Sequence, residues 1–430
     1  MKVSVVTLGC KVNQSESDTM AELLKLARHE LVEVHQAEVV ILNTCAVTAK
    51  AEAESRKWLH RLKREEKRVI VTGCWADLDP SAPEREGADG LIGNAEKDRI
   101  CEALEEVKRG QRVHWTSSVR GRLSLKVVPC PLSRTRAFLK VQDGCDSRCA
   151  YCVVPRLRGP SRSLDPEAIF DALKVLSEKG IKEVVLTGIH LGRWGYDLEV
   201  RRDLIWLLEE IEKRDSPPRV RLSSIEPQEV RRELIDLMAS SNKLCPHLHL
   251  PLQSGSRKVL EKMRRPYSPE DYQKLVLEAK ERLPEMAIGA DVLVGFPGEG
   301  DEDFEETLSL LEGLPLSYLH VFPFSPRPGT EAFGMSDRVK EEVKLKRAYI
   351  LRQLADKKKK EFYMSMLGKP LLVLVEGKTK EGLVTGTSRN YVKCQLEMEA
   401  SPGEEVLAEG QEVKGKWLLV KPSNPTTLSR

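Results

Sequence analysis

Three cysteines stand close together near the middle of the chain, at positions 145, 149 and 152 in the string GCDSRCAYC. Three thiolates at this spacing can hold three irons of a [4Fe–4S] cluster, and ferredoxin-type loops complete the set with a further cysteine. None follows nearby, so one iron would stay open to a small-molecule ligand. The alternative is structural zinc, but zinc takes four closed ligands, usually in C-x2-C pairs. We therefore expect an iron–sulfur cluster at Cys145, Cys149 and Cys152.

Three further cysteines, Cys10, Cys45 and Cys74, each end an apolar run: VSVVTLGC, VVILNTC and VIVTGC. Such runs are typical of parallel strands buried on both faces, whose carboxyl ends meet at one edge of a sheet. Scattered cysteines are also often small buried hydrophobes. The shared position after three strands favours a second three-cysteine cluster with its own open iron. Gly9 and Gly73 would let a cluster approach the backbone.

The composition indicates what class of protein carries these cysteines. The chain has 430 residues and a net charge of +3, with 40% hydrophobic and 31% charged residues, which predicts a soluble protein of two or three domains. It has no apolar run long enough for a membrane helix and no secretory signal. We expect a cytoplasmic protein, in which cysteines serve metal binding or catalysis rather than disulfides. The other four are expected to be buried or incidental thiols: Cys101, Cys130, Cys245 and Cys394.

The elements that must position the cysteines suggest an α/β fold in several parts. We expect a doubly wound parallel domain over residues 1–115, a linker over 116–135, and a full or partial parallel β/α barrel over 136–335. A basic helix over 336–365 would lead to a small all-β barrel over 366–430. The barrel strands are predicted at residues 137–142, 183–187, 219–223, 247–250, 287–294 and 317–323.

The motifs together resemble the radical S-adenosylmethionine (SAM) methylthiotransferases. The resemblance rests on LGCKVNQ, ILNTCAV, VTGCWA and VQDGCDSRCAYCVVPRLRGPSRS, and covers nearly the whole chain. It implies an N-terminal cluster domain, a radical SAM barrel and a TRAM domain. Three branches differ in substrate: isopentenyladenosine in tRNA, an aspartate of a ribosomal protein, and threonylcarbamoyladenosine in tRNA. GCKVNQ, QDGC, SSIEP and VFPFSPRPGT resemble the third branch.

The resemblance also implies the chemistry. It implies two [4Fe–4S] clusters and two molecules of SAM. One SAM would methylate a sulfur on the N-terminal cluster, and the other would be cleaved to a radical that removes hydrogen from C2 of the adenine at position 37 of tRNA. The implied partners are the tRNA substrate, a reducing electron-transfer protein and a sulfur donor of unknown identity. The rivals are another methylthiotransferase substrate, or a non-catalytic iron–sulfur protein that binds RNA or carries electrons.

The resemblance further points to residues that contact SAM or the substrate. Gly188 and Ser254 also fit ordinary turns, Glu226 also fits a surface carboxylate, and Arg327 suits a carboxylate or phosphate. His190, His247, His249 and His320 lie near predicted strand ends and are expected to be hydrogen-bonded core or rim residues. The candidate cofactor contacts are Tyr151, Gly188, Glu226, Gln253, Ser254, Asp291 and Arg327.

Charge is uneven along the chain. Residues 118–164 hold ten Lys and Arg, Arg120 among them, against two Asp, so this stretch carries +8. A basic region around the radical cluster suits RNA phosphates, which points to Arg156, Arg158 and Arg162. In the C-terminal module, Arg389, Asn390 and Tyr391 are candidates for RNA contact, with Tyr391 able to stack on a base. A module that binds protein, with Tyr391 in its core, is the alternative.

Overall fold

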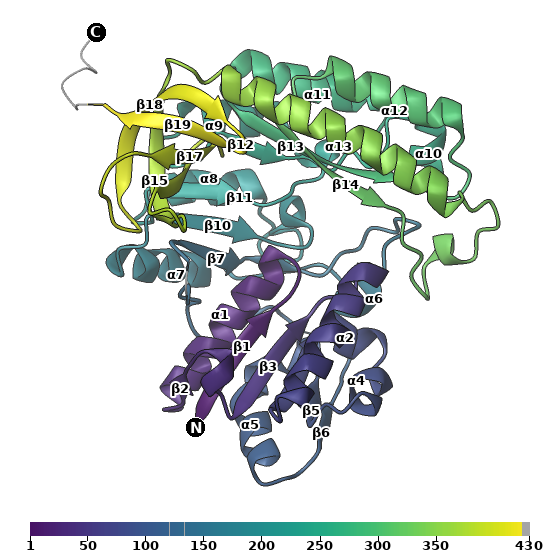
Figure 1. The fold of residues 1–430 in the computed structure, drawn as a ribbon, viewed down its shortest axis with the longest axis vertical. Coiled ribbons are helices and arrows are strands. Elements are labelled where there is room, and N and C mark those ends of the chain that lie inside the picture. The colour runs from purple at the N-terminus through teal and green to yellow at the C-terminus, as the bar shows by residue number, and fades with distance from the viewer. Residues whose placement is uncertain (120, 133, 424–430) are drawn as a thin grey trace.

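The computed structural model describes residues 1–119, 121–132 and 134–423. Figure 1 shows an N-terminal α/β unit, a central β/α unit beside it, and a small C-terminal β-barrel packed against one end of the central unit, at the left of the view. Arg120, which belongs to the predicted basic stretch, and residues 424–430 of the predicted C-terminal module lie outside the described residues. No helix of the described part is long and apolar enough to cross a membrane.

The N-terminal unit is a six-stranded parallel sheet in the order β2-β1-β3-β4-β5-β6. All six residues of β3 are buried, as its continuous apolar sequence predicts. Two separate cores pack the two faces of the sheet, one against α2 and the other against α1 and α5, so the predicted doubly wound fold is confirmed. The strands are β1 (Lys2–Thr7), β2 (Glu30–Leu31), β3 (Val39–Thr44), β4 (Arg68–Gly73), β5 (Gly90–Ile92) and β6 (Val113–Trp115). The helices are α1 (Lys11–Leu26), α2 (Ala49–Arg64), α3 (Cys74–Leu78), α4 (Ser81–Arg85) and α5 (Ile100–Lys108).

The central unit is a partial barrel of six parallel strands. Two three-stranded sheets, β11-β10-β7 and β12-β13-β14, are joined by bridges from Val220 to Leu244 and from Ser224 to His249. Within the described residues β7 and β14 are not paired, so the barrel is open there. The strands are β7 (Arg136–Lys140), β10 (Glu183–Thr187), β11 (Arg219–Leu222), β12 (His247–His249), β13 (Ala287–Val294) and β14 (Tyr318–Pro323), close to the predicted ranges.

Helices between these strands build the outer layer, and most of them bury their apolar faces in one continuous core. Their starts follow ordinary capping rules: the Asp165 side chain accepts the N–H of Glu167, and Ser268 forms a capping box with Asp271. The helices are α6 (Val154–Arg158), α7 (Pro166–Glu178), α8 (Leu204–Glu212), α9 (Arg232–Ser240), α10 (Arg257–Lys262), α11 (Pro269–Arg282) and α12 (Asp301–Gly313). A short antiparallel pair, β8 (Gln142–Asp143) and β9 (Arg162–Ser163), brackets the central cysteine loop.

The C-terminal module is a closed barrel in the order β15-β16-β17-β19-β18, reached through the long helix α13 (Glu341–Met364). The predicted small all-β barrel is confirmed. The pairing register of β18 shifts between Gly410 and Glu412, and this bulge interrupts the alternation that marks a strand. The strands are β15 (Pro370–Lys378), β16 (Val384–Ser388), β17 (Lys393–Leu396), β18 (Glu405–Lys414) and β19 (Trp417–Pro422).

Candidate functional site

The three N-terminal cysteines gather at one edge of the sheet, as the strand pattern predicts. Cys10, Cys45 and Cys74 follow β1, β3 and β4, which are neighbours in the sheet. Cys45 and Cys74 are buried, whereas Cys10 is exposed. Burial, together with the charge of Cys74, raises the pKa of Cys45 to about 12, and burial also raises the pKa of Cys74. The three thiols therefore interact electrostatically and would lose protons on binding metal.

Two glycines make this gathering feasible. Gly9 and Gly73 both have a φ in the left-handed region, at 94° and 95°. A Cβ on Gly9 would stand 2.7 Å from the Cβ of Cys45, and one on Gly73 would stand 2.4 Å from the carbonyl oxygen of Thr44. Other side chains would therefore separate the strand ends that carry the cysteines. The two glycines allow neighbouring strand ends to approach each other closely. The sequence analysis had expected them to let a cluster approach the backbone.

The central cysteines lie in a loop whose sulfurs have polar neighbours. The backbone N–H of Ser147 donates to Cys145 Sγ at 3.4 Å, and His190 Nδ1 lies 3.3 Å from the same sulfur. Burial alone would raise the pKa of Cys145, but these two contacts lower it. Arg265 donates to Cys149 Sγ at 3.3 Å. Such donors stabilise negative charge on cluster sulfurs.

Gln142 holds this loop in place. Its side-chain amide donates to the carbonyl of Gly144 at 2.8 Å and to the Ser161 hydroxyl at 3.0 Å, while its oxygen accepts the N–H of His190 at 2.7 Å. A Cβ on Gly188 would come within 3.0 Å of the Gln142 side chain. Gly188 thus permits the contact that joins the cysteine loop to the segment after β10.

The arrangement of the cysteine sulfurs bears on the zinc alternative. Among the described residues, only His249, Asp291 and His320 form a three-residue group of metal-binding type with all ligand atoms within 4.8 Å of one another. Neither cysteine trio is that compact, whereas sulfurs on a tetrahedral zinc lie about 3.8 Å apart. Neither trio is thus arranged for a single zinc ion.

Two of the predicted cofactor contacts lie beside the central cysteines. Glu226 forms an ion pair with Arg265, the same residue that donates to Cys149. Tyr151 is largely withdrawn from water, and its pKa is raised well above the ordinary value, chiefly by burial. Arg265 was missed by the sequence analysis because its link to Cys149 exists only in the folded chain. The only sequence signal would have been its place in a second basic string, MRRPYS.

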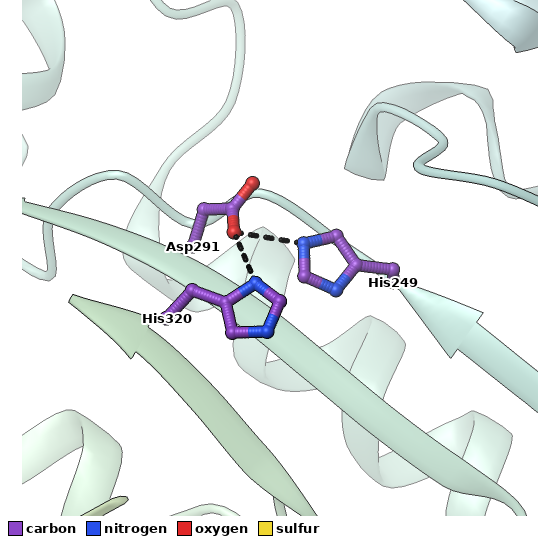
Figure 2. Close-up of side chains that lie close together, drawn as sticks. All are labelled: His249, Asp291 and His320. Carbon is purple, nitrogen blue, oxygen red and sulfur yellow. Dashed lines mark hydrogen bonds and ion pairs between the residues drawn. The ribbon is translucent and has the colours of Figure 1, made fainter. Parts of the chain in front are cut away.

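Asp291 belongs to a hydrogen-bonded chain through the barrel (Figure 2). Its carboxylate lies 2.9 Å from His249 Nε2 and 3.2 Å from His320 Nδ1. The Tyr318 hydroxyl lies 3.0 Å from His249 Nδ1 and 2.8 Å from His247 Nε2. Burial would raise the pKa of Asp291, but the two imidazoles lower it. The carboxylate is thus already paired with protein groups, and the histidines are hydrogen-bonded as predicted.

The remaining candidates divide into those that are free for a ligand and those that are not. Gln253 has a φ of 66°, and within the described residues its side-chain amide forms no hydrogen bond. Ser254 is buried and its hydroxyl lies 3.2 Å from that of Thr307, so it is a turn residue here. Arg327 is buried and paired with Glu52 of α2 at 2.5 Å. A ligand-binding role for Ser254 or Arg327 is therefore not supported by their contacts.

The prediction that Arg158 contacts RNA is wrong, because this side chain is only 1% exposed. It donates to Glu16 Oε1 at 2.8 Å, to Asn13 Oδ1 at 2.7 Å and to Asp143 Oδ1 at 3.1 Å. Glu16 and Asn13 come from α1, so Arg158 joins the N-terminal unit to the barrel. Arg162 is also mostly buried, 3.5 Å from Asp143. Arg156 alone of the three is exposed and stays a candidate for RNA.

The prediction for Arg389, Asn390 and Tyr391 also needs correction, because these residues form the contact between the two barrels. Arg389 donates to the carbonyl of Asn242 at 2.6 Å, and Asn390 donates to that of Glu285 at 3.1 Å. The ring of Tyr391 lies 4.3 Å from that of His247. The three residues thus bind the central barrel, and Tyr391 lies in the contact between the two barrels rather than in the core of the small module.

Buried charged side chains also take part in the contact between the two barrels. Arg219 and Arg221 both pair with Glu183, at 2.8 and 2.7 Å, and both are fully buried. Arg219 donates to the carbonyl of Thr387 at 2.9 Å and Arg221 donates to that of Arg389 at 2.8 Å. The charges of the two arginines outweigh burial and lower the pKa of Glu183 to about 2.

Comparison with known proteins shows which class of enzyme has this fold and cysteine loop. Residues 139–311 match the radical SAM superfamily, and residues 2–93 match an uncharacterized protein family, UPF0004. Among solved structures, the radical SAM methyltransferase TsrM of Kitasatospora setae, with cobalamin and a [4Fe–4S] cluster bound, has a TM-score of 0.55. The two are 18% identical, and the match covers 77% of this chain and 76% of that one. A partial barrel with a three-cysteine loop after its first strand thus defines a radical SAM enzyme.

Relatives make the assignment more specific. The chain is 39% identical to the threonylcarbamoyladenosine tRNA methylthiotransferase MtaB of Aquifex aeolicus, over 87% of this chain and 93% of that protein. It is 33% identical to the tRNA-2-methylthio-N(6)-dimethylallyladenosine synthase of Fervidobacterium nodosum, over 94% of each. The chain belongs to the radical SAM methylthiotransferase family, which implies a [4Fe–4S] cluster and SAM.

Proposed function

We propose that this enzyme attaches a methylthio group to C2 of N6-threonylcarbamoyladenosine at position 37 of tRNA. The observation that carries the proposal is the 39% identity, over nearly the whole of both chains, to a protein named for that reaction. The relative named for the dimethylallyl substrate is less similar, at 33%. A tRNA substrate would place the enzyme in the cytoplasm, as the sequence predicts.

The proposal assigns a [4Fe–4S] cluster to each cysteine trio. When bound, the cluster at Cys145, Cys149 and Cys152 would supply the electron that cleaves one SAM to a radical, and the other cluster would carry the sulfur that a second SAM methylates. The chain's own residues orient these groups. His190 and Arg265 donate toward the sulfurs of the central loop, and Gln142 fixes the loop itself. An electron-transfer protein would supply the reducing equivalents.

The buried contact between the two units has a role in this scheme. Arg158 follows the central cysteine loop in sequence, yet its positive charge lowers the pKa of Cys74 and of Cys45, against the larger effect of burial. One guanidinium therefore ties the barrel to the edge of the N-terminal sheet where its cysteines gather. A fixed distance between radical source and sulfur carrier is what a reaction at a single adenine carbon requires.

The test uses anaerobically reconstituted protein. Iron and sulfide per chain are measured first, and the protein is then incubated with dithionite, SAM and tRNA that bears threonylcarbamoyladenosine. About eight irons, 5′-deoxyadenosine and a methylthio nucleoside are expected. The contrary result is cleavage of SAM without a methylthio nucleoside on this tRNA, together with product on isopentenyladenosine tRNA or the ribosomal protein. That result would show that the enzyme belongs to another substrate branch.

A further inference from the structure

Three side chains of metal-binding type, none of them a cysteine, meet in the central barrel. His249, Asp291 and His320 lie on β12, β13 and β14, which are neighbours in one sheet. Asp291 stands opposite His320 in the strand register, and His249 stands opposite Gly289, two residues before Asp291. Residues two apart on a strand share a face, so the register puts all three on the same face. Figure 2 shows the three side chains pointing toward one another.

The distances between the ligand atoms fit one metal ion. Asp291 Oδ1 lies 2.9 Å from His249 Nε2 and 3.2 Å from His320 Nδ1. One ligand atom of each residue lies within 4.8 Å of the other two. Imidazole nitrogens and carboxylate oxygens bind zinc at about 2.0–2.2 Å, which puts neighbouring ligands roughly 3.0–3.5 Å apart around one ion. The two short contacts are therefore close to the separations that a shared ion requires.

The tyrosine beside His249 suits it for a role as a metal ligand. The Tyr318 hydroxyl lies 3.0 Å from His249 Nδ1. When Nδ1 carries the proton and donates it to this oxygen, Nε2 presents its lone pair toward Asp291. Metal-bound histidines almost always use their other ring nitrogen in this way. Gly289 makes room for the tyrosine, because a Cβ at this position would overlap the Tyr318 ring.

The group is open to solvent on one side. The exposed fraction of the side chain rises from 7% for His249 through 23% for Asp291 to 54% for His320. An ion can therefore reach the carboxylate from the side of His320. Three protein ligands also leave a coordination position for water, as in catalytic zinc sites.

We propose that His249, Asp291 and His320 bind one divalent transition-metal ion of the zinc class. Two imidazoles and one carboxylate favour such an ion over Mg²⁺ or Ca²⁺, which prefer oxygen ligands alone. The proposal goes beyond the proposed function, since it holds for any substrate that the enzyme modifies. It gives the barrel a metal site that is independent of the two cysteine trios.

The test uses the enzyme with reconstituted clusters, and Zn²⁺ as the probe. The protein is dialysed anaerobically against micromolar Zn²⁺, and zinc and iron per chain are measured in the same sample. We expect about one zinc per chain with no loss of iron. Asp291→Asn, which keeps the size of the side chain and removes its charge, should abolish this uptake. Tyr318→Phe should weaken zinc binding about 10- to 100-fold, because His249 loses the partner that orients it.

His114→Gln is the matched control. His114 Nδ1 lies 2.8 Å from Glu84, so this pair has the same kind of imidazole–carboxylate contact. Within the described part of the chain the pair belongs to no three-residue group of metal-binding type. The change should therefore leave zinc uptake as it is. Equal zinc in the unaltered enzyme and in Asp291→Asn would overturn the proposal. Absence of zinc uptake by the unaltered enzyme would also overturn it, because the three residues would then form hydrogen bonds only.

X-ray absorption at the zinc edge tests the proposal without any variant. Nitrogen and oxygen ligands at about 2.0–2.2 Å are expected, with the scattering pattern of two imidazoles. Sulfur at about 2.3 Å would place the zinc on cysteines and overturn the proposal. This measurement decides the matter if the melting temperature shows that Asp291→Asn does not fold. None of these readouts depends on a methylthio product, so they stay valid if the proposed function fails.

Discussion

The two cysteine trios are built by opposite means. Cys145, Cys149 and Cys152 come from one loop, and hydrogen-bond donors from other parts of the barrel reach their sulfurs. Cys10, Cys45 and Cys74 come from the ends of three separate strands, and burial dominates the environment of the second and third. The first kind of site depends on a short motif and its neighbours. The second depends on the whole sheet, including the glycines that let its strands approach.

The sharpest way to test this contrast is to remove one ligand from the central loop. Cys149→Ala should abolish the formation of 5′-deoxyadenosine, because the remaining two thiols cannot hold the cluster. Iron should fall from about eight to about four per chain. The assay is SAM cleavage under dithionite, followed by chromatography. Undiminished cleavage would show that the radical chemistry does not use this loop.

The corresponding change in the sheet should have a different signature. Cys45→Ala is expected to spare SAM cleavage and stop the transfer of sulfur to tRNA, with a similar loss of about four irons. Mass spectrometry of the nucleosides and quantification of 5′-deoxyadenosine in the same sample separate the two effects. Methylthio product from Cys45→Ala would contradict the sulfur-carrying role of the N-terminal site.

The contact between the two sites can be broken without touching a cysteine. Arg158→Met should lower the free energy of unfolding by about 3–5 kcal/mol, because it leaves Glu16 and Asp143 buried beside fewer cations. Urea denaturation measures the loss. Arg156→Met, two residues away but exposed, is the control and should change stability by less than about 0.5 kcal/mol. Equal effects of the two changes would mean that the buried network contributes little.

A smaller effect is expected at the contact between the barrels. The Glu183 pKa of about 2, against 4.5 ordinarily, means that the folded protein favours the charged form. The corresponding stability, about 3 kcal/mol, is present above pH 4.5 and is lost as the pH falls from there toward 2. Melting temperatures from pH 7 to pH 3 should show this decline. In Glu183→Gln the decline should be shallower, with a lower melting temperature at pH 7.

The same contrast explains what sequence could and could not predict. The six barrel strands and the three cysteine-bearing strands were predictable because a local apolar run marks each of them. The pairing of Arg158 with Glu16 was not, because a count of basic residues along the chain does not tell which of them meet acids after folding. Arg265 beside Cys149 and the docking of Tyr391 on His247 are likewise contacts between distant segments.

The wide separation of Cys10, Cys45 and Cys74 also affects how the enzyme is made. Iron offered to an unfolded chain meets a compact set of ligands only between residues 145 and 152. The N-terminal set exists only after β1, β3 and β4 have paired, which requires closing long loops and raises the contact order of that unit. Under the proposed function, the central loop would be open to loading early in folding, whereas the N-terminal edge would accept iron only from a chain that has already built its sheet.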